Sequence, residues 1–152
     1  KNFYGILASL KKIKINLLKG DIESAYNSYI LLLNNKKINN IYKSIISIQA
    51  IYLFIDNINF EILKKENLIF SSTNYYKYIT NLMTYIDDSI LSFQGHKYEL
   101  RFLTLLIEQE YNGEKILIEK VNEIFEQIQS NNNIKSPIKN RIKTIYEFYK
   151  YK

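Results

Sequence analysis

The sequence predicts an all-α fold, a stack of about eight antiparallel helices. Apolar residues recur with the 3.6-residue period of a helix along most of its 152 residues, and the breaks between periodic segments are short. Four Gly and one Pro leave little material for the turns of a many-stranded β fold. The length fits a single domain, 1–152, with possible halves at 1–70 and 71–152. Periodicity leaves open whether the helices form a regular α-solenoid or an irregular bundle.

The first two predicted helices cover 3–18 and 22–33. Gly20 between them suits the left-handed position that ends a helix, and Asp21 can cap the next one. The expected buried stripe of the first helix is Phe3, Ile6, Leu7, Leu10, Ile13 and Leu17, and that of the second is Ala25, Tyr26, Tyr29, Leu32 and Leu33.

The next two helices are predicted over 41–55 and 59–69, with Asp56-Asn57 as the turn between them. The inward positions of the third helix are Ile45, Ile48, Tyr52 and Ile55. Residues 44–48 also alternate like a strand and are rich in β-branched side chains. A strand there would need partners that the rest of the chain does not offer.

The fifth and sixth helices are predicted over 75–93 and 97–111. Residues 71–74 form a capping cluster ahead of the fifth, and Gln94-Gly95-His96 is the expected break between the two. The inward residues are Ile79, Leu82, Met83, Ile86 and Ile90 in the fifth helix, and Tyr98, Phe102, Leu105 and Leu106 in the sixth.

The last two helices are predicted over 114–129 and 138–149. Asn112-Gly113 turns the chain ahead of the seventh, and Ser136-Pro137 marks the start of the eighth, since Pro loses no hydrogen bond at a first helical position. The inward residues are Leu117, Val121, Ile124, Phe125 and Ile128, then Ile138, Ile142, Ile145, Tyr146 and Tyr149. Such short connections make neighbouring helices antiparallel, which gives four hairpins.

The net charge of +6 comes from 19 Lys but only two Arg, Arg101 and Arg141. Arginine reads bases and phosphates with two hydrogen bonds, so we do not expect nucleic acid as the partner. The last 18 residues are basic and interleaved with tyrosines, which leaves nucleic-acid or anionic-membrane contact as a further alternative. Lys, Asn, Ile and Tyr make up about half of the chain, a bias that resembles proteins of AT-rich genomes.

No catalytic, cofactor-binding or metal-binding residues are evident, and no small-molecule substrate. The absence of Cys excludes disulfides and thiol catalysis. His96 is the only histidine, and we expect a surface or capping role in a turn. Asp87 and Asp88 point about 100° apart on a helix, which suits a cap or a solvated face better than a shared proton. We therefore predict that the chain is not an enzyme.

The sequence does not decide whether the protein is located in the cytoplasm or in the periplasm or cell envelope. No run of apolar residues is long enough for a transmembrane segment. The chain begins at Lys1 rather than Met, so we expect a processed or trimmed fragment, and any signal peptide or lipid anchor would lie upstream.

Fourteen tyrosines are the other unusual feature. Three of them, Tyr75, Tyr76 and Tyr78, lie so close that we do not expect all to face one core, and exposed tyrosines make good binding faces. The residues we predict to form an interaction surface are Tyr26, Tyr29, Tyr75, Tyr76 and Tyr78.

The stretch Gly20-Asp21-Ile22-Glu23-Ser24-Ala25, followed by Tyr29, resembles the middle of a tetratricopeptide repeat. In that family a Gly-Asp turn separates two helices, a small residue lets them approach, and an aromatic fills the space between repeats. Tyr111-Asn112-Gly113 resembles the same turn, but Ile118 replaces the small residue, Ile13 replaces that of the first helix, and no closing Pro follows.

The resemblance implies a stack of helical hairpins whose partner is another protein. We therefore predict a non-enzymatic interaction or scaffold domain, binding through the concave side lined by alternate helices or through the tyrosines near 75–78. The alternatives are a helical cell-envelope protein of an AT-rich microbe that binds an envelope or host protein, and a basic nucleic-acid-binding domain.

Overall fold

The computed structural model describes residues 3–66, 69–112 and 116–150, and these fold into eight α-helices and one short 3₁₀ helix without a strand. The helices are α1 (Phe3–Leu18), α2 (Ile22–Leu33), α3 (Asn40–Asp56), α4 (Phe60–Lys65), α5 (Asn74–Met83), α6 (Leu91–Asn112), α7 (Ile116–Ser130) and α8 (Ser136–Lys150), with the 3₁₀ helix η1 over Phe70–Ser72. The predicted all-α fold is confirmed.

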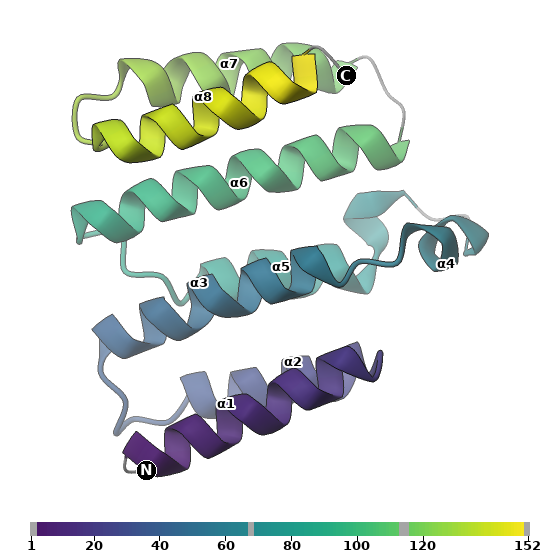
Figure 1. Cartoon of the computed structure of the whole chain (residues 1–152), viewed down its shortest axis with the longest axis vertical. Coiled ribbons are helices and arrows are strands. Elements are labelled where there is room, and N and C mark those ends of the chain that lie inside the picture. Colours follow the sequence, from purple (N-terminus) through teal and green to yellow (C-terminus); the bar gives the residue numbers. More distant parts are fainter. Residues whose placement is uncertain (1–2, 67–68, 113–115, 151–152) are drawn as a thin grey trace.

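The helices stack in layers along the long axis of the molecule, with α1 and α8 at opposite ends (Figure 1). Three pairs pack most closely: α1 with α2, α3 with α5, and α6 with α7. The last helix, α8, packs on both α6 and α7. The short α4 projects from one side of the stack (Figure 1), so the described helices form three closely packed pairs and a final helix rather than the predicted four hairpins.

Local signals define several helix starts. The Asp21 carboxylate accepts the Ser24 N–H at 3.2 Å, as predicted, and Asn39 accepts the Tyr42 N–H at 2.9 Å ahead of α3. Thr73 Oγ1 accepts the Tyr76 N–H at 3.3 Å. These caps satisfy backbone N–H groups that have no partner inside the helix. Gly20 has φ +82°, a left-handed conformation that side chains disfavour.

Helix α3 shows that the strand-like alternation of residues 44–48 does not decide their structure. It runs unbroken through this segment because both sides of the helix are covered by the fold: Ser44, Ile46, Ser47, Ile48, Ala50, Ile51 and Phe54 are all buried. A helix buried on several sides has no single apolar stripe. The prediction that Ile45 points into the core is wrong, because its side chain is exposed.

The predicted break between the fifth and sixth helices is wrong in position. Helix α5 ends at Met83, and α6 begins at Leu91 and continues through Gly95 and His96. The turn lies at 84–90 instead, where the Asp87 carboxylate accepts both the N–H and the hydroxyl of Ser89. The Asp87 N–H in turn donates to Ser44 Oγ of α3 at 2.9 Å, which fixes the turn to the core.

Smaller differences occur at the other helices. The predicted helix 59–69 is shorter, ending at Lys65, with η1 after it. Helix α8 begins at Ser136, so the first accepting carbonyl is that of Lys135 and Ser136 lies inside the helix. The start predicted for the seventh helix, and the side chains of Phe3, Leu117, Ile118 and Tyr149, lie outside the described residues.

The buried apolar side chains form two clusters. The larger one joins α1, α2, α3 and α5 and reaches Leu100 of α6. The smaller one lies among α6, α7 and α8 and contains Phe102, Leu106, Val121, Ile128, Ile134, Ile138 and Ile142. Helix α6 thus contributes to both cores.

Candidate interaction groove

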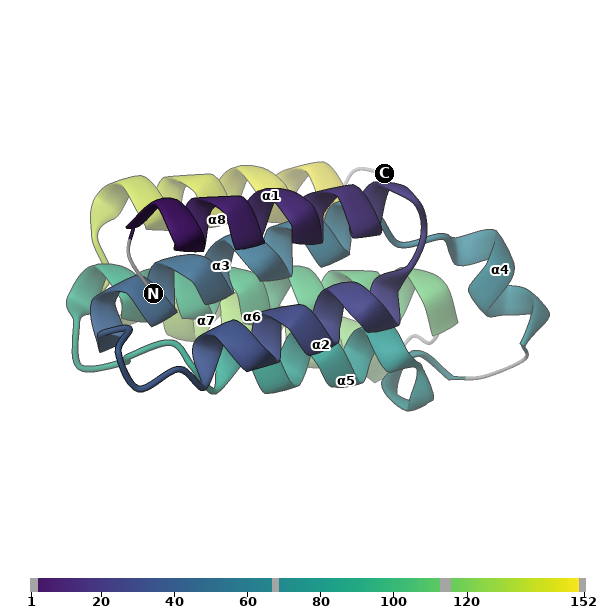
Figure 2. The ribbon, with the colours of Figure 1, turned by 90° about the horizontal axis from the view of Figure 1, so that it is seen from below.

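A surface groove runs between α1 and α3 and consists of two hollows. One of about 400 Å³ lies beside the start of α3, and one of about 490 Å³ lies further along it. The two hollows share Leu10, Ile46 and Gln49, so they are continuous. Figure 2 shows α1 and α8 on the same side of the molecule, with α3 lower between them.

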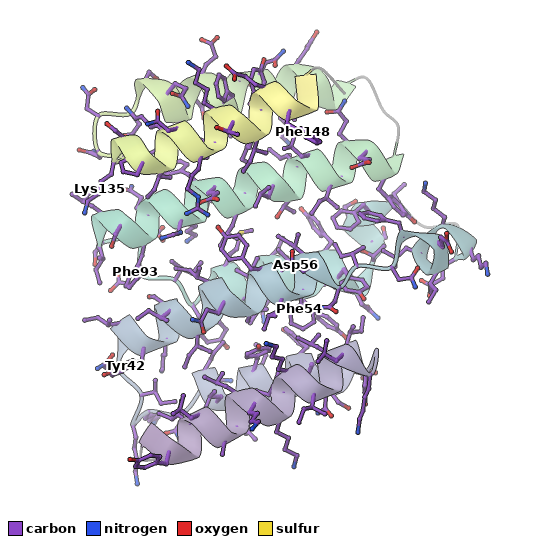
Figure 3. The ribbon with its side chains drawn as sticks, in the orientation of Figure 1. Tyr42, Phe54, Asp56, Phe93, Lys135 and Phe148 are labelled. Carbon is purple, nitrogen blue, oxygen red and sulfur yellow. The ribbon has the colours of Figure 1, made fainter. Side chains whose placement is uncertain are left out.

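The first end of the groove is apolar and open to solvent. Leu7 of α1 is 46% exposed, and Tyr42 and Ile45 of α3 are 54% and 38% exposed. Ile38 lies buried beneath them. Figure 3 shows Tyr42 at the beginning of α3, opposite the end that carries Phe54 and Asp56. Both Leu7 and Ile45 belong to the stripes that the sequence predicts to be inward, so the prediction for Leu7 is wrong as well.

The second end of the groove is amphipathic. Its lining combines Lys11 and Lys14 of α1 with Gln49 and Tyr52 of α3, over the buried ring of Tyr29. Burial raises the pKa of Tyr29 to about 12. Among the described residues, the charged side chains that line the two hollows are all lysines, namely Lys11, Lys14 and Lys37. The groove is therefore apolar at one end and positive along its length.

A buried polar cluster lies beyond Tyr52, at the junction of α3, α6 and α8. Glu99 of α6 is 2% exposed, and its Oε1 lies 2.9 Å from Arg141 Nη2 of α8. The other oxygen, Oε2, lies 3.9 Å from His96 Nδ1. Burial and then the nearby Glu99 charge raise the pKa of Tyr52 to about 12, while Arg141 acts in the opposite direction.

Three buried atoms of this cluster have no hydrogen-bond partner among the described residues: Tyr52 Oη, His96 Nδ1 and Glu99 Oε2. The charges of Glu99 and Arg141 both influence the pKa of Tyr52, but the Tyr52 hydroxyl forms no hydrogen bond with either side chain. The expectation that His96 lies in a turn is wrong, because it lies within α6 beside a buried carboxylate. Glu99 was not singled out from the sequence, since nothing in a helical pattern marks a buried Glu, and nothing there connected His96, Arg141 and Tyr52 with one another.

The five predicted tyrosines pack between helices of this same chain. Tyr29 and Tyr75 are buried, and the other three are half-buried. Tyr26 of α2 stacks on Tyr78 of α5 with ring centroids 4.0 Å apart and planes at 13°. Tyr75, Tyr76 and Tyr78 all contact the larger core, so the expectation that they cannot face one core is wrong. Their role in binding a partner stays a prediction.

Tyrosine hydroxyls also connect distant parts of the chain. Tyr75 Oη donates to the Asn57 carbonyl, and Tyr111 Oη donates to the Leu63 carbonyl, both at 2.9 Å. The Tyr146 hydroxyl donates a hydrogen bond to Asn122 Oδ1 at 2.6 Å. A tyrosine buries its ring and satisfies its polar tip in this way, which gives the high tyrosine content a structural use.

A further hollow of about 360 Å³ lies between α5 and α6. Its charges are mixed, because Lys97 and Arg101 are accompanied by Glu108. Lys97 is also paired with Asp88 at 2.8 Å. Among the described residues, no three or more His, Asp or Glu side chains gather in a way that could hold a metal ion. In the same part of the chain, no helix is both long and apolar enough to cross a membrane.

No family model, no curated protein and no solved structure matches this chain.

Proposed function

We propose that this chain is a non-enzymatic protein-interaction domain of a helical-repeat type, and that it binds its partner in the groove between α1 and α3. The observation that carries the proposal is the solvent exposure of Leu7, Tyr42 and Ile45 together at one end of that groove. Contiguous apolar surface that stays exposed in a folded domain is typical of interaction sites.

The arrangement of the helices supports the resemblance to tetratricopeptide repeats. Three closely packed hairpins, α1–α2, α3–α5 and α6–α7, are followed by the single helix α8. Ala25 is fully buried, and Tyr29 packs against Phe54 of the next hairpin with ring centroids 6.1 Å apart. These are the roles that the resemblance gives to a small residue and to an aromatic four positions later.

The groove also lies on the side that such a stack uses for binding. Helices α1 and α3 are the first members of successive hairpins, and the side they line corresponds to the concave side of a repeat stack (Figure 2). The cell-envelope and nucleic-acid alternatives remain predictions, and no feature of the groove favours either of them.

The experiment is affinity capture from the cells that make this protein, comparing wild type with Ile45→Asp. The matched control is Ile62→Asp, which changes an exposed isoleucine outside the groove. We expect a partner that is recovered with wild type and with Ile62→Asp but not with Ile45→Asp. The purified partner should also bind the purified wild-type protein directly. Equal recovery of every co-purifying protein with the two variants would contradict the proposal.

A further inference from the structure

We propose that the occupant of the groove is an acidic amphipathic helix of the partner protein. This inference rests on the proposed function and specifies the chemistry of the partner. It assigns the apolar anchors of that helix to the Leu7–Tyr42–Ile45 end of the groove and its carboxylates to Lys11 and Lys14.

The charge of the lining selects an acidic ligand. Lys11, Lys14 and Lys37 line the groove, and no Asp or Glu of the part of the chain that the structure describes lines either hollow. The buried carboxylate beyond Tyr52, that of Glu99, is already paired with Arg141. A positive groove with apolar walls attracts carboxylates and disfavours lysine-rich partners, because like charges in contact raise the free energy of the complex.

The backbone of the groove selects a helix over an extended strand. Both walls, α1 and α3, are helices whose interior N–H and C=O groups are already paired. An extended ligand would find no strand edge to pair with, whereas a helix satisfies its own backbone groups. Along α3 the groove runs from Tyr42 to Tyr52, which is about 15 Å at the helical rise and matches roughly three turns of a bound helix.

The apolar walls favour protein over nucleic acid. The described lining contains Ile6, Leu7, Leu10, Ile45 and Ile46, and it includes no arginine. Base edges and phosphates are most often contacted by arginine with two hydrogen bonds, and the described lining of the groove offers only lysines as cations. An amphipathic helix instead places its apolar stripe on these walls and its acidic flank beside the lysines.

The test uses a synthetic helical peptide of about 16 residues, long enough to hold helical structure, with Leu at i, i+3, i+4 and i+7 and Glu on the flanks. A second peptide carries Lys in place of every Glu. Amide spectra of the labelled protein are recorded with each peptide up to about 1 mM. We expect the acidic peptide to shift the resonances of Leu7, Tyr42 and Ile45, and the basic peptide to bind at least about tenfold more weakly.

Charge reversal identifies the contacts. The double variant Lys11→Glu/Lys14→Glu should bind the acidic peptide roughly tenfold more weakly than wild type does, and it should bind the basic peptide more tightly. Lys12→Glu is the matched control, because Lys12 is exposed on the same helix but lines neither hollow. Circular dichroism checks that each variant remains folded. Equal binding of both peptides, absence of binding, or displacement of the acidic peptide by single-stranded DNA would overturn the inference.

The two proposals fail separately. If capture of the natural partner depends on Ile45 but not on Lys11 and Lys14, the groove binds protein and the acidic-helix inference is wrong. If capture depends on neither, the proposed function is wrong as well.

Discussion

Gly95 of α6 lies directly against Ile138 of α8, and a Cβ placed on Gly95 would overlap Ile138 Cδ1. The glycine is buried in the second turn of the 22-residue helix α6, where Ala would ordinarily be preferred by about 1 kcal/mol. Its value here is the close approach of two helices rather than backbone freedom. The missing methyl group leaves room for the end of the Ile138 side chain between α6 and α8.

We predict that Gly95→Ala destabilises the protein by about 1 kcal/mol, because overpacking outweighs the gain in helix propensity. In an Ile138→Val background, which lacks the overlapping atom, the same substitution should be neutral or stabilising. Urea unfolding of the two single variants and the double variant measures the coupling. Additive effects would show that the methyl group added at Gly95 does not compete with Ile138 Cδ1 for space.

The ion pair between Glu99 and Arg141 gives a second prediction. Arg141→Met leaves a buried carboxylate without its cation and should destabilise the protein by about 1–2 kcal/mol, a value reduced because Arg141 is itself half exposed to solvent. The double variant Glu99→Gln/Arg141→Met should be more stable than Arg141→Met alone, since a neutral amide costs less to bury. Urea unfolding at neutral pH compares the two, and a double variant that is less stable would contradict this account.

The stacked rings of Tyr26 and Tyr78 join α2 to α5. In a double-mutant cycle with Tyr26→Leu and Tyr78→Leu, we expect a coupling free energy of about 1 kcal/mol. The control combines Tyr26→Leu with Tyr146→Leu, which removes a ring from the separate α7–α8 stack on Phe125. That pair should be additive. Thermal or urea unfolding gives the values, and a coupling near zero for Tyr26 and Tyr78 would show that the stack adds nothing beyond burial.

Alkaline pH should destabilise the fold through Tyr29. Burial raises the pKa of this tyrosine from 10.0 to about 12, so the folded protein keeps its phenol proton where the unfolded chain has lost it. Its contribution to stability is complete below pH 10 and is lost as the pH rises from 10 to about 12. In Tyr29→Phe the free energy of unfolding should fall less steeply with pH over this interval, whereas Tyr42→Phe, at an exposed site, should leave the slope unchanged. Unfolding free energies measured across this interval check the slope, and an unchanged slope in Tyr29→Phe would contradict the prediction.

The helices whose signals are local were predictable from the sequence. The ranges 3–18 and 22–33 agree with α1 and α2 because Gly20 and Asp21 end one helix and start the next through their own backbone and side-chain geometry. The extent of α5 and α6 was not predictable in this way. Gly95 resembles a helix break in sequence, and only the proximity of Ile138 gives a glycine a reason to lie inside a helix.

The candidate groove was predictable only in outline. The recessed side of a hairpin stack follows from the repeat-like pattern, but the sequence places Leu7 and Ile45 in the core. Periodicity identifies the apolar face of a helix and does not tell whether another helix covers all of it. The Glu99 cluster was missed for a related reason: its members come from α3, α6 and α8, and a carboxylate gives no sign of burial until those helices meet.

The sequence by itself determined the all-α class, the short connections and the charge, since these depend on residues within a few positions of one another. The tertiary structure decided which apolar residues are left exposed, which glycine allows close packing and which charges are buried together. These depend on the distance between helices far apart in the chain, and that distance is set by the packing of the whole core.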